Sequence, residues 1–599
     1  MKISLKNKDE NRIIYGNKND NLLKVLRENK IEVNNNCGAK GNCGKCKVKI
    51  LSESYLKISK SDEKHLSKDE LDKGIRLSCM ITLQDDIEIE LINKKDDIYA
   101  LTEIYNDITP LDSNVKKTFL ELEKPSLLDQ RDDIKRLKRK LNIKDLQINI
   151  KDLQQLTNIL EENNYKVSLT TYKNKILHIQ GGDRSKYKYG VAVDLGTTTV
   201  ALYLLDLNSG KIISVLSQVN NQRAYGSDVI SRINYTMEKE NGVFELHKCI
   251  IDQINKMIDE ISIKNNIDKN EIYNLIVVGN TTMIHLFIKL PCKNIALAPF
   301  VPTFTEKYEC SSFKLGININ GIISFPPSIS AYVGSDISAG ILSSNLCKNE
   351  KYSLLLDMGT NGELALGNKE KIFTCSTAAG SAFEGTNIKY GVGGIEGAIS
   401  SIDLSKDKIY KTINDKEPCG ICGSGVLDIC SELLKYEIID ESGRICDSDE
   451  VENENLRKRL NEGNNLKEFI IFENENKKIA FTQKDIREVQ LAKAAICAGI
   501  KVLLKESHLT YEDVEHMYIG GGFGNYMNVK SAVNIGMIPK EFEDKIKSIG
   551  NCAGKGAIDY LLNMKKENEI TQITDRCEYI ELSKSKDFQE FYIDSISFE

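Results

Sequence analysis

Four cysteines near the N-terminus have the types and spacing needed for metal chemistry. Cys37, Cys43 and Cys46 lie within ten residues, and Cys79 follows further along the chain. Iron–sulfur clusters require thiolate ligands, and glycines between the cysteines let backbone N–H groups approach the cluster sulfurs. A structural zinc site is the alternative, although such sites normally use two separated C-x2-C pairs. The spacing therefore favours an iron–sulfur centre over zinc.

The C-x5-C-x2-C spacing is one residue longer than the plant-type C-x4-C-x2-C form, and it matches vertebrate-type and bacterial [2Fe–2S] ferredoxins. Short alternating runs, a helical stretch with Leu22, Leu23 and Leu26 on one face, the cysteine loop and further alternating runs follow in order. This order is that of a β-grasp fold. The predicted strands are residues 3–5, 12–15, 47–51 and 86–91.

Two glycine-containing turns could bind phosphate. Asp194 and Asp357 each end an apolar run and are followed by a Gly-Thr pair. Such a hairpin exposes successive N–H groups, and threonine hydroxyls add donors. The aspartate carboxylates are suited to hold Mg²⁺, usually through water. The residues expected to contact a nucleotide here are Asp194, Gly196, Thr197 and Thr198, then Asp357, Gly359, Thr360 and Asn361.

These two turns form a weak internal repeat, because the second copy begins 163 residues after the first. A duplicated strand–turn–strand unit predicts two related lobes that face each other across a cleft, where ligands bind. A third element, Gly520, Gly521 and Gly522 after a strand, permits close approach of a flat ring such as adenine. We expect Asp194, Asp357 and Asp336 to be the catalytic carboxylates. Asp228 and Asp336 either border the cleft or are solvated loop residues.

Other chemically notable residues have simpler interpretations. His285 lies in an apolar run, so a hydrogen-bonded core histidine is favoured over a partner contact. Cys419 and Cys422 form a C-x2-C pair without a second pair, which disfavours a metal site. The glycine-rich segment 378–385 is either a contact with a partner protein or a tight turn.

Composition limits the function classes. The 599 residues carry 81 basic and 87 acidic side chains, which excludes a broadly basic nucleic-acid binder. No run approaches the roughly 18 apolar residues needed to cross a bilayer, and the first residues lack the apolar core of a signal peptide. Among the sixteen cysteines, the cluster near the N-terminus indicates metal or redox chemistry rather than disulfides, and the twelve scattered later in the chain are expected to be inert buried thiols. We therefore expect a cytoplasmic protein that binds neither membrane nor nucleic acid.

Four segments are predicted along the chain. Residues 1–96 form the β-grasp domain and residues 97–116 a linker. Residues 117–186 form a small α+β middle domain, with Ile134, Leu137 and Leu141, and then Leu153, Leu156 and Leu160, at helical spacing. Residues 187–599 form the duplicated, two-lobed domain. The fold class is thus multidomain, α+β and α/β.

The phosphate turns and the glycine run resemble those of the actin, sugar-kinase and Hsp70 superfamily of ATPases, whose lobes are RNase H-like. Together with the [2Fe–2S] ferredoxin domain, they resemble the reductive activators of corrinoid-dependent enzymes. The resemblance covers nearly the whole chain, including residues 226–232, 279–285, 326–336, 378–385, 420–425 and 485–493. Ser381 and Asn221 stand where this family usually has proline.

The resemblance implies an enzyme that hydrolyses ATP and passes one electron from a [2Fe–2S] cluster to a Co(II) corrinoid, restoring Co(I). It implies ATP with Mg²⁺ as the second cofactor. Its partners would be a corrinoid protein of a methyltransferase system and a low-potential electron donor, and its relatives form homodimers.

Two alternatives stay open at this stage. One is a small-molecule kinase fused to a ferredoxin. The other is a plain ferredoxin-type electron carrier whose large C-terminal part is only a docking domain. Activators of acyl-CoA dehydratases share the ATPase fold but are much shorter and lack the N-terminal cluster domain.

Overall fold

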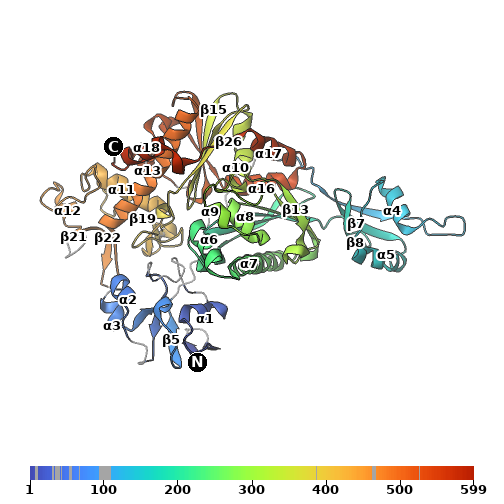
Figure 1. Ribbon diagram of the computed structural model, residues 1–599, viewed down its shortest axis with the longest axis horizontal. Helices are drawn as coiled ribbons and strands as arrows, with labels where there is room; N and C mark the ends of the chain where they lie inside the picture. The colour runs from blue at the N-terminus through green and yellow to red at the C-terminus, as the bar shows by residue number, and fades with distance from the viewer. Residues whose placement is uncertain are drawn as a thin grey trace. The chain divides into compact units, whose positions relative to one another are not determined.

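The structure is a computed structural model. It describes residues 1–6, 11–29, 31, 33, 41, 44–52, 57–66, 68–92, 109–385, 387–461, 467–475, 477–524 and 527–598 (Figure 1). The chain divides into two compact units. One comprises Met1–Asp97 with Val219–Ile250, and the other Ile98–Gln218 with Ile251–Glu599.

The N-terminal residues form a five-stranded sheet with the order β2-β1-β5-β3-β4. Strand β1 pairs in parallel with β5, and the other three pairs are antiparallel. Helix α1 (Leu22–Glu28) buries Leu22, Val25 and Leu26 against this sheet. The predicted β-grasp fold is confirmed. The other elements are β1 (Lys2–Lys6), β2 (Arg12–Tyr15), β3 (Lys47–Ile50), β4 (Ile75–Leu77), β5 (Ile87–Leu91), α2 (Lys60–His65) and α3 (Lys68–Asp72).

The same unit contains a helical segment from later in the chain. Helix α6 (Val229–Glu238) begins at Asp228, whose carboxylate accepts a hydrogen bond from the backbone N–H of Ser231. Asp228 therefore caps a helix, which is the ordinary use of aspartate at this position. The long helix α7 (Gly242–Lys264) follows and continues into the second unit.

The small middle domain is a three-stranded antiparallel sheet with two helices. Its strands, β6 (Val115–Glu121), β7 (Lys166–Tyr172) and β8 (Lys175–Gly181), lie in sequence order. Helices α4 (Asp133–Leu141) and α5 (Ile150–Glu162) bury Leu137, Leu156 and Leu160 in a core of their own. Leu153 was expected on the same face but is 44% exposed, so the apolar face of α5 is narrower than its periodicity predicts.

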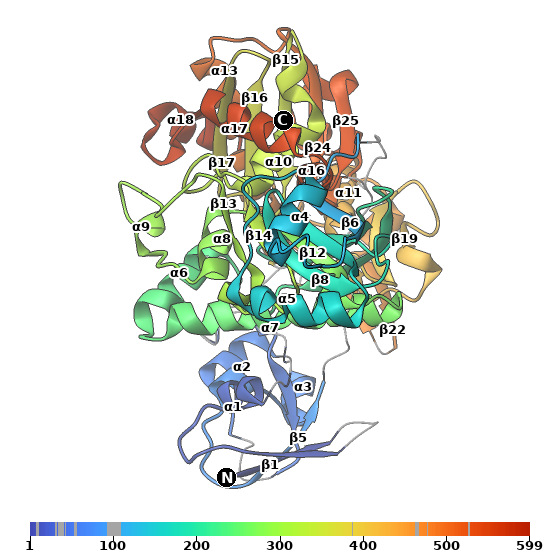
Figure 2. The same cartoon turned by 90° about the vertical axis from the view of Figure 1, so that its right-hand side faces the viewer.

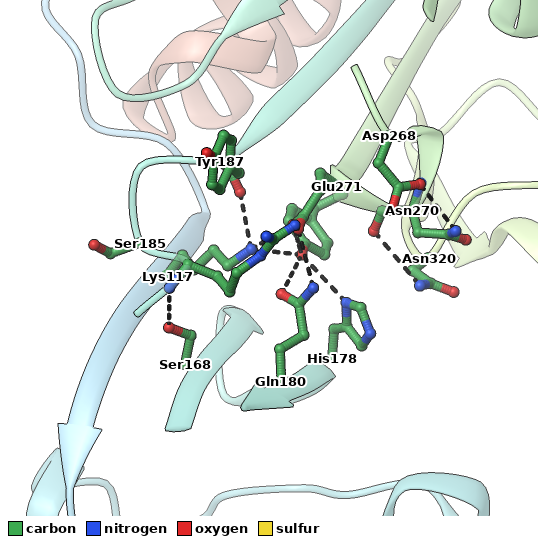
Figure 3. A network of polar contacts seen from close by, with 12 residues as sticks. Lys117, Ser168, His178, Gln180, Ser185, Tyr187, Asp268, Asn270, Glu271 and Asn320 are labelled. Carbon is green, nitrogen blue, oxygen red and sulfur yellow. Dashed lines mark hydrogen bonds and ion pairs between the residues drawn. The ribbon is translucent and has the colours of Figure 1, made fainter. Parts of the chain in front are cut away.

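A buried ion pair joins this domain to the next part of the chain. The Lys117 ammonium on β6 meets the Glu271 carboxylate, and their side chains are 0% and 1% exposed (Figure 3). The Tyr273 hydroxyl donates to Glu271 at 2.6 Å, and the Gln180 amide donates to the same carboxylate at 3.0 Å. Burial raises the pKa of Glu271, but the hydrogen bond from Lys117 and its other donors outweigh burial and hold that pKa low. Because every polar atom of the pair has a partner, the joint is rigid.

The two predicted lobes are present, and each contains a six-stranded sheet. In the first, β9 (Tyr189–Leu195) and β10 (Thr199–Asp206) form a hairpin, and β9 also pairs in parallel with β12 (Ile272–Gly279). In the second, β15 (Tyr352–Met358) and β16 (Gly362–Gly367) form the hairpin, and β15 pairs in parallel with β24 (Val514–Gly520). The repeat seen in the sequence is therefore a repeat of sheet topology.

The sheet orders are β11-β10-β9-β12-β14-β13 and β25-β24-β15-β16-β17-β26. Their other strands are β11 (Ile212–Val219), β13 (Tyr308–Ser311), β14 (Ile322–Phe325), β17 (Ile372–Thr377), β25 (Ile546–Gly550) and β26 (Cys577–Tyr579). In the part of the chain described, no helix is long and apolar enough to cross a membrane.

Helices α10 (Ser335–Ser344) and α16 (Cys552–Leu562) cross in close contact between the lobes (Figures 1 and 2). A Cβ added at Gly556 would lie 2.1 Å from the backbone oxygen of Ala339, so only glycine allows this approach. The first residues of both helices point their polar groups at the site described below. The crossing therefore sets the distance between those groups.

The two lobes contain further helices and short strands. The longest helix of the second lobe is α13 (Gln483–Glu506). The remaining helices are α8 (Thr281–Ile288), α9 (Lys293–Ala296), α11 (Gly423–Lys435), α12 (Glu454–Arg457), α14 (Gly521–Gly524), α15 (Val529–Asn534), α17 (Lys565–Arg576) and α18 (Lys586–Asp594). The remaining strands are β18 (Ala398–Ile402), β19 (Tyr410–Thr412), β20 (Gly420–Ile421), β21 (Leu460–Asn461), β22 (Glu468–Asn474) and β23 (Lys477–Thr482).

Candidate functional site

Two of the four predicted cluster ligands lie together. The sulfur atoms of Cys46 and Cys79 are 3.2 Å apart, and the two residues are only 1% and 6% exposed. Cys46 directly precedes β3, and Cys79 lies in a short 3-10 turn after β4. A backbone hydrogen bond from Ser78 N–H to the Cys46 carbonyl holds the two segments at 2.8 Å. Cys37 and Cys43 lie outside the described residues.

The surroundings of this thiol pair fit an iron–sulfur centre. Leu23, Leu66 and Leu77 pack around the cysteines and exclude water. Gly41 and Gly44 have φ values of +71° and +66°, where a Cβ would lie 2.8 Å from Met80 and 2.7 Å from His65. The loop thus needs glycine at both positions. Dry thiols beside a glycine-rich loop are the setting in which a [2Fe–2S] cluster is bound.

Arg27 is a charged residue of this site that the sequence analysis missed. Its Nε and Nη2 atoms are buried and have no hydrogen-bond partner among the described residues, and its guanidinium lies 5.9 Å from the ring centre of Tyr225. Burial lowers the pKa of Arg27, whereas Tyr225, Tyr235 and the thiols of Cys46 and Cys79 act in the opposite direction. A positive charge therefore lies within electrostatic reach of the cluster ligands. No motif marks it, since its place depends on how α1 packs.

The two predicted phosphate hairpins meet at their tips. Thr198, between β9 and β10, and Thr360, between β15 and β16, have hydroxyl oxygens 3.0 Å apart. Thr197 is 8% exposed and accepts a hydrogen bond from the Asn280 amide at 2.9 Å. At Gly196 an added Cβ would lie 2.6 Å from the Thr199 carbonyl, whereas at Gly359, on the second hairpin, it would lie in ordinary contact, 3.9 Å from the Asn361 carbonyl. Residues 162 positions apart in sequence thus form one donor group.

The Glu384 carboxylate is bound between these two threonines. Thr198 donates to its Oε2 at 3.0 Å, and Thr360 lies 3.3 Å from Oε1 and 3.1 Å from Oε2. Glu384 belongs to the glycine-rich segment 378–385. The segment is therefore part of the site, a role that its sequence did not reveal.

Four carboxylates lie beside the hairpins. Asp194 is near the end of β9, Asp357 near the end of β15, and Asp336 in the first turn of α10. Glu363 is the cross-strand partner of Asp357 and was not predicted. The sequence signal that could have identified Glu363 is a single charged residue in an otherwise apolar strand, three residues after Thr360.

The pKa values of these groups are raised. Burial raises the pKa of Asp194 to about 6, and burial with the neighbouring Asp194 charge raises that of Asp357 to about 7. Burial and then the charges of Asp357 and Asp194 raise the pKa of Asp336 to about 8. The pKa of Glu363 is raised well above its usual value by burial, Asp336 and Asp357. Crowded, dry carboxylates of this kind are stabilised by a divalent cation.

No three of the His, Cys, Asp and Glu residues in the described ranges are close enough to ligate one metal ion directly. Mg²⁺ usually keeps several waters and contacts protein through one or two carboxylates and substrate phosphates. The arrangement of Asp194, Asp336 and Asp357 is therefore suited to a hydrated Mg²⁺ that a nucleotide brings with it.

The start of α16 supplies two further contacts. The Asn551 amide donates to Asp194 at 2.9 Å and lies 3.0 Å from the Tyr203 hydroxyl, while the Cys552 sulfur lies 3.9 Å from the Asp357 carboxylate. Asn551 also accepts from the Gly554 N–H as the helix cap. An asparagine just after a strand is a recognisable cap signal, but its contact with Asp194 depends on tertiary packing.

The glycine run lies against the second hairpin. β24 ends at Gly520, and Gly521 has a φ of +85° at the start of α14. A Cβ at Gly521 would lie 2.6 Å from both Asp357 Oδ1 and the Met358 carbonyl, whereas Gly522 has nothing within 4 Å. The run thus approaches the hairpin closely on one side and leaves space on the other for a ring.

Three other candidates have structural roles. His285 is fully buried, accepts from the Thr303 N–H at 3.0 Å through Nε2 and lies 2.7 Å from the Thr281 carbonyl through Nδ1. The sulfurs of Cys419 and Cys422 contact different backbone carbonyls, at 3.4 Å and 3.3 Å. His285 is thus a hydrogen-bonded core histidine, as its apolar run predicts.

The fold and the two sites define a class of protein: a [2Fe–2S] ferredoxin-like domain joined to a two-lobed ATPase of the actin type. Family models match four parts of the chain. Residues 6–84 match the 2Fe-2S iron-sulfur cluster binding domain. Residues 106–186 match the RACo linker region, residues 189–349 the RACo middle region, and residues 351–599 the C-terminal domain of RACo, the ASKHA domain.

Similar proteins cover most of the chain. The corrinoid activation enzyme RamQ of Eubacterium limosum is 32% identical over 571 residues, covering 93% of this chain and 92% of the relative. The [Co(II) methylated amine-specific corrinoid protein] reductase of Methanosarcina barkeri is 26% identical over 455 residues, which is 68% of this chain and 77% of that protein. A solved reductive activator for corrinoid, iron-sulfur protein superposes with a TM-score of 0.76 at 33% identity, covering 100% and 98% of the two chains. The chain belongs to this RACo family of reductive activators, and its cofactors are a [2Fe–2S] cluster and ATP with Mg²⁺.

Proposed function

We propose that this chain uses ATP to activate a corrinoid protein reductively, returning Co(II) to Co(I). The observation that carries the proposal is the presence, on one chain, of a buried thiol pair and of a phosphate and carboxylate site in a full-length relative of corrinoid activation enzymes. A [2Fe–2S] cluster supplies one electron at low potential.

The N-terminal residues hold and insulate the redox centre. Cys46 and Cys79, with Cys37 and Cys43, are the proposed ligands, and the surrounding leucines keep water away from the sulfurs. Arg27 contributes a positive charge close by. A nearby cation stabilises the more negative, reduced state of such a centre.

The two-lobed domain binds the nucleotide. Thr197, Thr198 and Thr360 donate hydroxyl groups to phosphate oxygens, and the glycine run from Gly520 to Gly522 contacts the base. Asp194, Asp336 and Asp357 hold hydrated Mg²⁺, with Asn551 fixing the Asp194 carboxylate. ATP changes the redox equilibrium only through its different affinity for two states of the complex.

The partner is a corrinoid protein, which the names of two relatives support. We further propose that this corrinoid protein belongs to a methyltransferase system. A low-potential protein donor supplies the electron, and the chain works as a homodimer. We place it in the cytoplasm, since a reducing compartment keeps so many thiols available.

The test is a spectroscopic assay with a purified Co(II) corrinoid protein and a low-potential reductant. Formation of Co(I) in the visible spectrum should need both this chain and Mg-ATP. Asp194→Asn should abolish the ATP-dependent formation of Co(I), and Asp403→Asn, on a surface loop, should not. Hydrolysis of ATP with transfer to a small molecule would instead favour the kinase. Formation of Co(I) at the same rate without ATP would indicate a plain electron carrier.

A further inference from the structure

The position of Glu384 has a consequence for nucleotide binding. Each threonine hydroxyl has one proton to donate. The hydroxyl oxygens of Thr198 and Thr360 lie 3.0 Å apart and within 3.0–3.1 Å of Glu384 Oε2, so their two protons are shared between the carboxylate and the contact between the hydroxyls. The same two hydroxyls are the proposed donors to phosphate. They cannot donate to Glu384 and to a phosphate oxygen at the same time.

Electrostatic repulsion between a phosphate and the Glu384 carboxylate adds to this competition for the two hydroxyl groups. A phosphate between the two hairpin tips would lie next to the Glu384 carboxylate, and the carboxylates of Asp194, Asp336, Asp357 and Glu363 already crowd the site. Like charges at contact distance repel strongly where little water screens them. A phosphate that bridges the hairpins therefore requires the Glu384 side chain to leave.

The backbone around Glu384 permits such a departure. Ala382 and Phe383 are 2% and 5% exposed and fix the turn in the core of the lobe. Gly385 has a φ of +73° and packs tightly, since an added Cβ would lie 2.5 Å from the Val392 carbonyl. Gly380 has a φ of +75° and nothing within 4 Å. The turn that carries Glu384 is thus held in place on both sides, so a departure of the carboxylate would be a rotation of the side chain about its own bonds.

We propose that Glu384 is a specificity-determining residue that competes with the terminal phosphate of the nucleotide for Thr198 and Thr360. This inference rests on the proposed function, because it takes the hairpins as the nucleotide site. A triphosphate displaces the carboxylate from both hydroxyls. A diphosphate, which lacks the phosphate that bridges the tips, leaves it in place.

The test compares affinities for Mg-AMPPNP and Mg-ADP by isothermal titration calorimetry. Glu384→Ala and Glu384→Gln should bind Mg-AMPPNP about tenfold more tightly than the wild-type chain, which is about 1.4 kcal/mol. Their affinity for Mg-ADP should change less than threefold, so the ratio of the two affinities shifts. A purely structural effect would change both affinities together. Glu396→Gln, an exposed glutamate that accepts from Asn414 at 2.9 Å, is the matched control.

Asp194→Asn separates this inference from the proposed function. If the wild-type chain binds Mg-AMPPNP and Asp194→Asn weakens binding, the nucleotide site stands. If folded Glu384→Gln then binds Mg-AMPPNP no more tightly than the wild-type chain does, Glu384 does not compete with the phosphate, although the nucleotide site itself still stands. If the wild-type chain binds no nucleotide, or Asp194→Asn has no effect, the proposed site itself is wrong. Thermal unfolding of each variant shows which are folded, and Glu384→Gln keeps the size of the side chain should Glu384→Ala not fold.

Discussion

Asp194, Asp336 and Asp357 each have a raised pKa in the folded protein, so their protonation links stability to pH. Around pH 5 to 6 they retain protons in the folded protein that the unfolded chain, with its ordinary aspartate pKa, has already released. The folded state then binds more protons, and the free energy of unfolding falls as pH rises from the ordinary aspartate range toward the raised values. This sign is opposite to that of a carboxylate in a salt bridge.

We expect the Tm of the chain in EDTA to fall between about pH 5 and pH 8. Asp336→Asn should flatten this dependence, and Asp403→Asn, at a partly exposed loop position, should not. Mg-AMPPNP should also flatten it, because the cation neutralises the carboxylates. Differential scanning fluorimetry across this range measures the effect. A Tm that is level or rises over the range would contradict it.

Arg27 is the second residue whose charge has a measurable effect. Loss of the guanidinium removes a cation near the thiols of Cys46 and Cys79, so Arg27→Gln should make the cluster harder to reduce. A lost attraction of about 1.4 kcal/mol corresponds to a midpoint roughly 60 mV more negative for one electron. A redox titration followed by electron paramagnetic resonance measures this, and Arg27→Lys should keep most of the wild-type potential. Equal potentials for the Arg27→Gln and wild-type proteins would show that the guanidinium does not act on the cluster.

At the scale of elements, the crossing of α10 with α16 positions the carboxylate site. Gly556→Val would place side-chain atoms where the Ala339 carbonyl lies and separate the helices. We expect a loss of stability of about 1–3 kcal/mol, as for other overpacked contacts. Nucleotide binding should also weaken, because Asp336 and Asn551 lie at the N-terminal ends of these two helices. Denaturant unfolding and calorimetry test both.

Ser344→Ala, in the last turn of α10, is the control for this change and should alter neither property. If Gly556→Val lowered stability and left the nucleotide affinity unchanged, the crossing would stabilise the fold without positioning the site.

Hydrophobic periodicity and turn residues predicted well those features that depend on a single strand, helix or turn. The β-grasp order, the duplicated hairpins with Asp194 and Asp357, and the end of β24 at Gly520 were all predicted from periodicity and turn chemistry. The contacts of Glu384, Asn551 and Arg27 were not, because each depends on segments distant in sequence that pack together. Leu153 shows a smaller limit: helical spacing gives the direction of an apolar face but not its width.

At the scale of the whole molecule, the redox and nucleotide sites belong to different compact units. Their defects should therefore separate. Asp194→Asn should lower ATP hydrolysis about 10- to 100-fold, as loss of an outer contact to a bound metal does elsewhere, while dithionite still bleaches the cluster. Cys79→Ser should lose the iron–sulfur absorbance and still bind Mg-AMPPNP.

Both variants should fail to form Co(I) catalytically with a corrinoid protein. Iron and sulfide analysis, phosphate release and visible spectra measure the three properties on the same samples. Loss of nucleotide binding in folded Cys79→Ser would mean that the two sites depend on each other for their structure.

The buried pair of Lys117 and Glu271 also has a mechanical meaning. It fixes the middle domain to the base of β12, a strand of the first lobe (Figure 3). If that lobe rotates, the middle domain therefore rotates with it. Leu127 and Leu128, two exposed leucines between β6 and α4, belong to this domain and would move with it.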